Sequence, residues 1–202
     1  SKEKTTPHMV TIIDYGTGNL RSITNALDRL GATYTLTADP AAIRSAERVL
    51  LPGVGEAATA MQQLRDKGLI ETLRSLSCPV LGICLGMQLL CAHSEEGDTP
   101  CLGIFPNHVR RFPALPGLKV PHVGWNSIHD LRSPLYDGLR EGEYVYYVHS
   151  YAAEINDCTA AATDYGIRFS GSLWRDNYFG CQFHPEKSGS TGSRILANFL
   201  SL

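Results

Sequence analysis

The chain has 202 residues, of which 43% are hydrophobic, and this is enough apolar material to build the core of one compact domain. Acidic and basic side chains are interspersed and sum to a formal net charge of -2, which argues against nucleic acid or an anionic membrane surface as a partner. No apolar run approaches the roughly 18 to 20 residues of a membrane-spanning helix, and the N-terminus lacks the apolar core of a signal peptide.

The cysteines show neither CxxC pairs nor the Cys/His spacing of a zinc site, and a chain of this length needs no disulfide scaffold. They stand at positions 78, 84, 91, 101, 158 and 181. Reduced thiols in a cytoplasmic protein are therefore expected, without a metal. Residues 1–8, SKEKTTPH, are polar and precede a methionine, so we expect them to be a disordered remnant of expression and 9–202 to be one domain.

The first half of the chain alternates between short apolar runs and segments with helical spacing. The runs predict strands at 10–13, 33–36, 48–53 and 78–83, and the spacing predicts helices at about 20–30, 40–47, 56–68 and 85–94. Strands that alternate with helices imply right-handed crossovers, and hence a parallel sheet with helices on both faces.

The pattern changes after residue 100. Short segments there alternate apolar and polar residues between Gly, Pro, Asn and Asp, which is typical of antiparallel strands. A last helix is predicted over 191–202. The predicted fold is thus three-layered α/β and flavodoxin-like, with a central mostly parallel sheet, helices on both faces and an antiparallel extension.

Cys84 stands between Gly82 and Gly86 where a predicted strand meets a predicted helix. The pattern G-x-C-x-G is the thiol version of the G-x-S-x-G nucleophile elbow, whose strained turn needs small flanking residues. At a helix N-terminus the dipole favours the thiolate, and the amide of Leu85 points toward an oxyanion forming beside the sulfur. The pattern indicates a nucleophile. The alternative is a small buried cysteine in a glycine-flanked turn.

The stretch GCQFHPEKS, 180–188, supplies a base for such a thiol. Gln182, His184 and Glu186 alternate in an apparent strand, and Pro185 biases His184 toward extended backbone, so the imidazole and the carboxylate emerge on the same side. A Cys/His/Glu arrangement is the usual logic of covalent catalysis. On its own the stretch is also compatible with a solvated strand end, but both motifs follow predicted strands, where open α/β sheets place their sites.

Three further segments have alternative interpretations. The glycines of LLPGVG, 50–55, suit a second oxyanion donor or an ordinary strand-to-helix turn. DYGTGN, 14–19, is not a nucleotide loop, because Arg21 stands where G-x-G-x-x-G needs glycine. The aromatic strand that ends at 149–151 suits a binding edge or core packing. In KVPHVGWNS, 119–127, His122 and Trp125 are expected to be exposed, and Trp125 is a candidate for either the core or an interface.

Together, LPGVG, LGICLGMQLL and FHPEKS resemble the class I, triad-type glutamine amidotransferases. DYGTGNLRS, PHVGWN and YVHSY are similar to one branch of that family, the glutaminase subunits of imidazole glycerol phosphate synthases, and the resemblance spans 9–202. It implies Cys84 as nucleophile, His184 as base and Glu186 as its orienting group, with the backbone amides of Val54 and Leu85 as oxyanion donors. Around the glutamine it implies Gly53, Gly55, Gln88, His149, Ser150 and Tyr151.

The resemblance also implies a heterodimer with a (β/α)8 cyclase subunit, which uses the released ammonia in histidine biosynthesis and activates the glutaminase when its own ligand binds. The chemistry supports a partner independently, because free ammonia is mostly ammonium at neutral pH and the chain has no cofactor motif or second domain for an acceptor reaction. The predicted interface comprises Tyr15, Asn19, Pro121, His122, Trp125 and Asn126. Alternatives are a glutaminase of vitamin B6 or anthranilate synthesis, a free-standing cysteine hydrolase or peptidase, and an inert scaffold.

Overall fold

The computed structural model describes residues 8–18 and 20–202. The predicted expression remnant lies outside this description except for His8, and so does Asn19 of the predicted interface. The strands are β1 (Met9–Ile13), β2 (Thr33–Thr37), β3 (Val49–Leu51), β4 (Val80–Ile83), β5 (His93–Ser94), β6 (Thr99–Pro100), β7 (His108–Arg111), β8 (His122–Ser127), β9 (Tyr144–His149), β10 (Tyr151–Ala153), β11 (Thr159–Tyr165), β12 (Ile167–Arg175) and β13 (Tyr178–Cys181). The helices are α1 (Arg21–Arg29), α2 (Pro40–Arg44), α3 (Ala57–Asp66), α4 (Ile70–Arg74), α5 (Leu85–Leu89) and α6 (Gly189–Leu200), with short 3-10 helices η1 (Pro134–Tyr136) and η2 (Pro185–Lys187).

The strands form one large mixed sheet and one small sheet. The large sheet has the order β2-β1-β3-β4-β13-β12-β10-β7-β5-β6, and β11 pairs with β12 outside this path. From β2 to β13 neighbouring strands are parallel, whereas from β13 to β7 they are antiparallel. β8 and β9 form a separate antiparallel pair. The predicted mostly parallel sheet with an antiparallel extension is confirmed.

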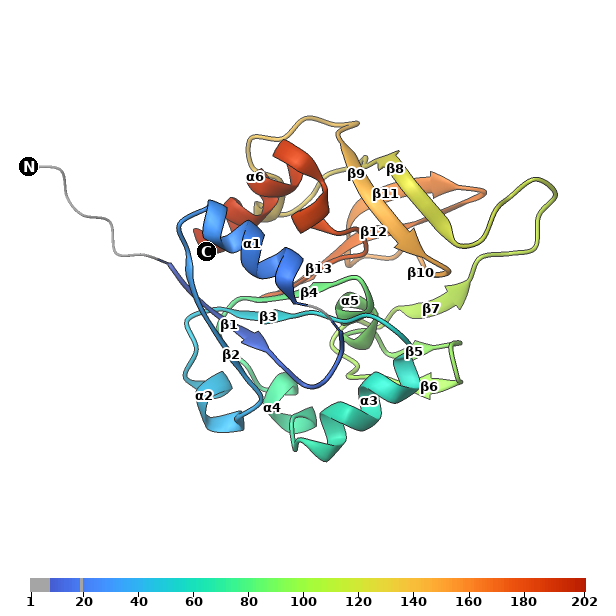
Figure 1. Cartoon of the computed structure of the whole chain (residues 1–202). Coiled ribbons are helices and arrows are strands. Elements are labelled where there is room, and N and C mark those ends of the chain that lie inside the picture. Colours follow the sequence, from blue (N-terminus) through green and yellow to red (C-terminus); the bar gives the residue numbers. More distant parts are fainter. Residues whose placement is uncertain (1–7, 19) are drawn as a thin grey trace, which may run out of the picture.

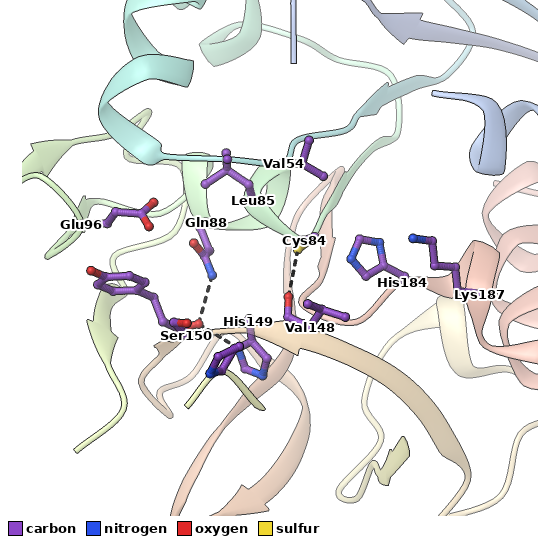
Figure 2. A pocket seen from close by; sticks show the side chains of 13 residues that line it. Val54, Cys84, Leu85, Gln88, Glu96, Val148, His149, Ser150, His184 and Lys187 are labelled. Carbon is purple, nitrogen blue, oxygen red and sulfur yellow. Dashed lines mark hydrogen bonds between the residues drawn. The ribbon is translucent and has the colours of Figure 1, made fainter. Parts of the chain in front are cut away.

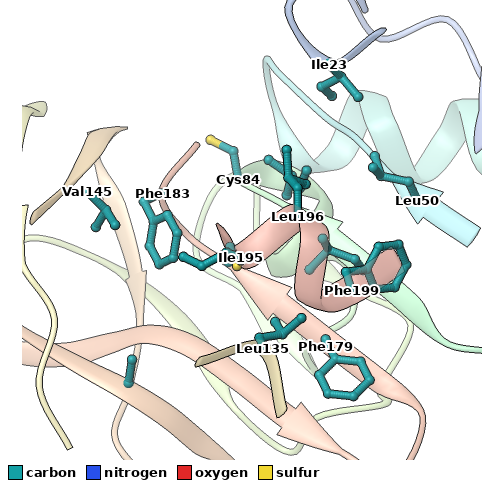
Figure 3. Packing of buried hydrophobic residues seen from close by; sticks show 14 of the residues in the cluster. Ile23, Leu50, Cys84, Leu135, Val145, Phe179, Phe183, Ile195, Leu196 and Phe199 are labelled. Carbon is teal, nitrogen blue, oxygen red and sulfur yellow. The ribbon is translucent and has the colours of Figure 1, made fainter. Parts of the chain in front are cut away.

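The large sheet divides the core into two layers, and helices cover both faces: α1 and α6 lie on one side, and α2, α3 and α4 on the other (Figure 1). Successive residues of the central strands point to opposite faces. In β3, Leu50 joins Ile23 of α1 and Phe199 of α6 in one layer (Figure 3), whereas Val49 and Leu51 join the other. Burial on both faces explains why these strands are continuous apolar runs in the sequence.

Three helices differ from the sequence-based expectation. The helix predicted over 40–47 ends at Arg44. The helix predicted over 85–94 ends at Leu89, because the backbone of Ala92 bonds to Asn107 and to Cys101 and so enters the sheet region. The helix α4 was not predicted, since five residues are too short for helical periodicity to stand out. Within residues 8–18 and 20–202, no helix has the length and apolarity needed to cross a membrane.

Candidate active site

Two neighbouring parallel strands bring together residues that are far apart in the sequence. β4 pairs with β13, with Ile83 opposite Cys181. Cys84 follows β4 directly, and His184 follows β13 after a short extension. Because parallel strands end at the same edge of a sheet, Cys84 and His184 both reach one cavity there.

The turn at Cys84 has the strained geometry of a nucleophile elbow. Cys84 has φ 55° and ψ -116°, a conformation that L-residues rarely adopt and that clusters at functional sites. A Cβ on Gly86 would lie 1.9 Å from the carbonyl oxygen of Leu51, and a Cβ on Gly82 would lie 2.8 Å from the backbone of Gly86. Both flanking glycines are therefore required by close backbone packing, and this packing holds the cysteine in its turn.

The His184 imidazole is fixed by Glu186. Its Nδ1 donates to Oε1 of Glu186 at 2.6 Å, and the two side chains are only 9% and 3% exposed. The backbone adds to this restraint, because the Ser188 hydroxyl donates to the carbonyl oxygen of His184 at 2.6 Å. With Nδ1 engaged, Nε2 remains for Cys84, toward which the ring is turned (Figure 2).

The charges around His184 favour an imidazolium. Burial lowers the pKa of His184, but hydrogen bonds and opposite charges from Cys84 and Glu186 outweigh burial and raise it to about 10. At neutral pH the arrangement therefore favours a proton on His184, beside the sulfur of Cys84. The imidazolium holds a proton that a leaving group can accept.

A cavity of about 430 Å3 opens beside the sulfur, within the usual size of small-molecule sites. Most of the residues predicted to surround the substrate or an oxyanion line it, together with Cys84 and His184. They are Gly55 and Tyr151, together with Val54, Leu85, Gln88, His149 and Ser150, which are labelled in Figure 2. Gly53 instead lines a smaller adjoining cavity, and a Cβ there would lie 3.0 Å from the amide nitrogen of Gly86, so its small size serves elbow packing.

The cavity also contains residues that the sequence did not single out. Glu96, from the turn between β5 and β6, lines it while accepting a hydrogen bond from the Ala57 amide at 2.7 Å. Burial raises the pKa of Glu96, and that hydrogen bond opposes the shift. In the sequence this residue looks like part of a solvated acidic turn. Val148 and Lys187 line the cavity as well, and only their tertiary neighbours reveal this.

Gln182 was noted in the sequence only as one member of an alternating strand. Its side chain is fully buried, and its Nε2 donates toward the Cys84 sulfur at 3.9 Å. Its Oε1 accepts from Nε2 of Gln88 at 2.8 Å. The sequence held one signal for its role: a glutamine lies between the apolar residues Cys181 and Phe183, and a buried polar side chain needs a hydrogen-bond partner.

Two buried histidines form a pair in which His149 lines the cavity and His122 lies behind it. Nδ1 of His149 lies 2.8 Å from the carbonyl oxygen of Tyr151, and Nε2 of His149 lies 2.8 Å from Nδ1 of His122. Because a carbonyl only accepts, Nδ1 of His149 is a donor, and the neutral pair then has His122 donating to His149. Burial lowers the pKa of His122 to about 4. Burial also lowers the pKa of His149, to about 3, and the nearby His122 and His184 lower it further, whereas the hydrogen bond to Tyr151 raises it.

Two residues predicted for the partner interface are buried, so their predicted surface placement is wrong. His122 is 3% exposed because alternate residues of β8 point inward, and Tyr15 is 1% exposed, with its hydroxyl donating to the Pro52 carbonyl oxygen at 2.7 Å. Trp125 points outward and is 56% exposed, which excludes its alternative place in the core. Pro121 is exposed as expected.

Asn126, the remaining described member of the predicted interface, is half-buried. Its Nδ2 donates to the Asp164 carbonyl oxygen at 3.0 Å and lies 3.3 Å from Nε2 of His122. It therefore ends the chain of hydrogen bonds that runs through the histidine pair. Across residues 8–18 and 20–202, no cluster of three or more His, Cys, Asp or Glu side chains is arranged to hold a metal ion.

Comparison with known proteins agrees with this geometry. The model of the family "Glutamine amidotransferase class-I" matches residues 11–202. The chain is 52% identical to the imidazole glycerol phosphate synthase subunit HisH of Bacteroides thetaiotaomicron, covering 96% of this chain and 99% of that one. It is 50% identical to the protein of the same name from Xylella fastidiosa, with 96% and 97% coverage.

Solved structures share the fold at low sequence identity. A putative GMP synthase subunit from Thermoplasma acidophilum superposes with a TM-score of 0.75 at 18% identity, covering 97% of this chain and 94% of that one. A structure of PurLQS from Thermotoga maritima gives a TM-score of 0.71 at 17% identity, with 97% and 99% coverage. The chain belongs to the class I glutamine amidotransferase family. The predicted resemblance to the glutaminase subunits of imidazole glycerol phosphate synthases is also confirmed.

Proposed function

We propose that the protein is the glutaminase subunit of an imidazole glycerol phosphate synthase. It hydrolyses L-glutamine to glutamate and ammonia through a thioester on Cys84 and passes the ammonia to a cyclase subunit. Near-full-length relatives bearing that synthase subunit's name support the assignment. The single observation that carries the chemistry is the Cys84, His184 and Glu186 arrangement at the wall of a ligand-sized cavity.

In the first half of the reaction the Cys84 thiolate attacks the side-chain amide of glutamine. The negative charge passes to the carbonyl oxygen, which the amides of Val54 and Leu85 stabilise, and removing one such donor costs roughly 2.7 to 4 kcal/mol. His184 then gives its Nε2 proton to the departing ammonia. In the second half His184 takes a proton from water as the water oxygen bonds to the thioester carbonyl carbon. The tetrahedral intermediate then collapses, the C–S bond breaks with its electron pair passing to sulfur, and glutamate leaves.

Recognition of glutamine is assigned to hydrogen-bond acceptors in the cavity. Nε2 of Gln88 donates both to the carbonyl oxygen of Tyr151 at 3.1 Å and to Oε1 of Gln182 at 2.8 Å, so both of its hydrogens are used. Gln88 therefore offers a ligand only its oxygen. This oxygen and the Glu96 carboxylate suit the α-ammonium group of an amino acid, which a simple ester or acid substrate lacks.

The cyclase subunit is proposed to bind the outer face of the β8-β9 sheet. Val123, Trp125 and Tyr144 are 57%, 56% and 61% exposed there, and Val123 pairs across the strands with Val148, which also lines the cavity. Exposed apolar patches of this kind mark protein interfaces. Ammonia released beside Val148 would then emerge at the covered surface instead of entering bulk water.

The segment 53–55 is the proposed link between partner binding and activity. Turning one peptide there would add or remove an oxyanion donor, and Gly55 already has φ 96°. Gly18 packs against this segment, because a Cβ on Gly18 would lie 2.3 Å from Cγ2 of Val54. A partner that contacts Gly18 is therefore positioned to shift Val54.

The deciding experiment measures glutamine hydrolysis in the presence and absence of the ligand-bound cyclase. Wild-type protein is expected to be strongly activated by the liganded cyclase, Cys84→Ser to be inactive, and Cys78→Ser, which removes a half-buried cysteine elsewhere, to match wild type. Labelling by a glutamine-analogue electrophile should map to Cys84. If the isolated protein were as fast as the liganded complex, the coupling would be excluded.

The same experiment separates the alternatives. Turnover of esters or peptides without a partner and without preference for glutamine would indicate a free-standing cysteine hydrolase. Activation by a synthase of vitamin B6 or anthranilate formation would reassign the partner, and an unreactive Cys84 would leave only a scaffold. We infer a cytoplasmic location because all six cysteines are free, as expected in a reducing compartment.

A further inference from the structure

Two buried glutamine side chains connect the cavity to the nucleophile. Gln182 lies on the extension after β13 and is fully buried, and Gln88 lies on α5 and is 5% exposed. Their amides are joined at 2.8 Å, and the nitrogen of Gln182 lies 3.9 Å from the Cys84 sulfur, within reach of a sulfur acceptor. A buried amide pair beside a reactive sulfur needs an explanation beyond packing, because apolar side chains would fill the same space without a requirement for partners.

A backbone carbonyl fixes the donor and the acceptor of each hydrogen bond from Tyr151 through Gln88 and Gln182 to Cys84. The carbonyl oxygen of Tyr151 only accepts, so the nitrogen of Gln88 must face it. That nitrogen then donates its second hydrogen to the oxygen of Gln182. The amide of Gln182 is thereby oriented with its oxygen away from Cys84 and its N–H toward the sulfur.

We propose that Gln182 is a catalytic hydrogen-bond donor to the Cys84 sulfur. Negative charge resides on this sulfur once the thiol has given up its proton and attacks as the thiolate. It returns when water has attacked the thioester, the C–S bond breaks and its electron pair goes to sulfur. A donor N–H held at the sulfur stabilises both states, and the chain from Tyr151 through Gln88 prevents the amide from turning its oxygen toward the thiolate.

The proposal rests on the proposed function, because it assigns a role at the same nucleophile. The test uses the protein in complex with its liganded cyclase and measures acylation and thioester breakdown separately, by rapid quenching and intact-mass detection of the glutamyl-protein. Gln182→Met keeps the length of the side chain and removes the donor. Breakdown is expected to slow about ten- to hundredfold, as for loss of a hydrogen bond to a charged group. The glutamyl-protein should then accumulate at steady state.

Ser172→Ala is the matched control. Ser172 is also fully buried, lies on β12 opposite Cys181, and donates to the Gly180 carbonyl oxygen at 2.7 Å without reaching Cys84. If the glutamyl thioester breaks down as fast in Gln182→Met as in Ser172→Ala, the proposal is overturned. Gln182→Glu provides a second variant of the same shape, whose carboxylate still accepts from Gln88 but cannot donate to sulfur, and it should slow breakdown at least as much.

The two hypotheses fail in different ways. If Cys84 is not the nucleophile, wild-type protein forms no glutamyl-protein at that residue, and the proposed function falls. If Cys84 is the nucleophile but Gln182 has no role at the sulfur, wild-type protein forms and releases the thioester, and both Gln182 variants release it at the rate of the control.

Discussion

The β4-β13 edge and the β8-β9 sheet contribute to one cavity in different ways. At the first edge, short motifs of glycine, cysteine, histidine and glutamate determine backbone shape as well as chemistry, as the clash between a Gly86 Cβ and Leu51 shows. In the second sheet, the same short stretch sends Trp125 to the surface and His122 into the core. A sequence motif therefore locates functional side chains reliably where it also constrains the backbone. It is less reliable in a strand, where the alternation of side chains decides which residues are exposed.

The largest effect is expected at the first edge, from Gly86→Ala. A methyl group there would meet the Leu51 carbonyl oxygen at 1.9 Å, so the elbow must move or the protein must fail to fold. We expect soluble yield and glutamine hydrolysis both to be lost. Gly103→Ala is the control for backbone strain without a clash, because a Cβ at Gly103 meets nothing within 4 Å while φ there is 74°. It should be modestly destabilised but remain folded and active. A folded and active Gly86→Ala protein would show that the elbow is not packed as described.

Glu186→Gln tests the orientation of the base at the same edge. The amide keeps the shape but loses the charge that helps raise the pKa of His184 to about 10. By analogy with the Asp→Asn change in serine protease triads, kcat should fall by up to about 10^4-fold. Glutamine titrations by stopped-flow would give kcat and KM separately, and a change confined to KM would contradict an orienting role.

Trp125→Ala probes the second sheet and should have a smaller effect. Truncating a central aromatic residue of an interface typically weakens binding by about 2 kcal/mol or more, roughly 30-fold. Affinity for the cyclase, measured by calorimetry, should fall by this factor while the fold is unchanged. Ile155→Ala, which truncates an apolar side chain that is 44% exposed on another segment, is the control. Undiminished affinity of Trp125→Ala would move the interface elsewhere.

A pH dependence of stability, with no loss of activity, separates the two regions. The folded-state pKa of His122 is lowered from 6.5 to about 4, so below pH 6.5 the unfolded chain binds protons that the folded protein does not, and the free energy of unfolding falls as pH falls from 6.5 to about 4. His184 behaves oppositely, because its raised pKa gives stability that is present below pH 6.5 and is lost as pH rises through about 10.

Urea unfolding of wild type and His122→Gln between about pH 4 and pH 10 checks both the loss of stability on the acid side and the loss on the alkaline side. The variant should show a weaker loss of stability between pH 6.5 and 4 and an unchanged loss on the alkaline side. If the acid limb of the variant is as steep as that of wild type, His122 is not a neutral buried group in the folded protein.

Much of the fold and the core of the site could be predicted because local physics determines them. Alternating strands and helices dictate a parallel sheet, and both motifs follow strands whose carboxyl ends face one edge, so Cys84 and His184 had to be candidates for one cleft. The structural role of Gly82 and Gly86 was also predictable, because only residues without a Cβ fit a nucleophile elbow. These features depend on neighbours in the sequence and on rules that hold for all parallel sheets.

Other features were decided only by the tertiary structure. Glu96 reaches the cavity because β5 and β6 join the far end of the large sheet, and Gln182 meets Gln88 because β4 and β13 are adjacent. Tyr15 is buried because its hydroxyl finds the Pro52 carbonyl oxygen on another strand's extension. Such contacts join segments that are far apart in the sequence. The role of a buried polar group depends on its hydrogen-bond partner, and a local sequence pattern does not contain that partner.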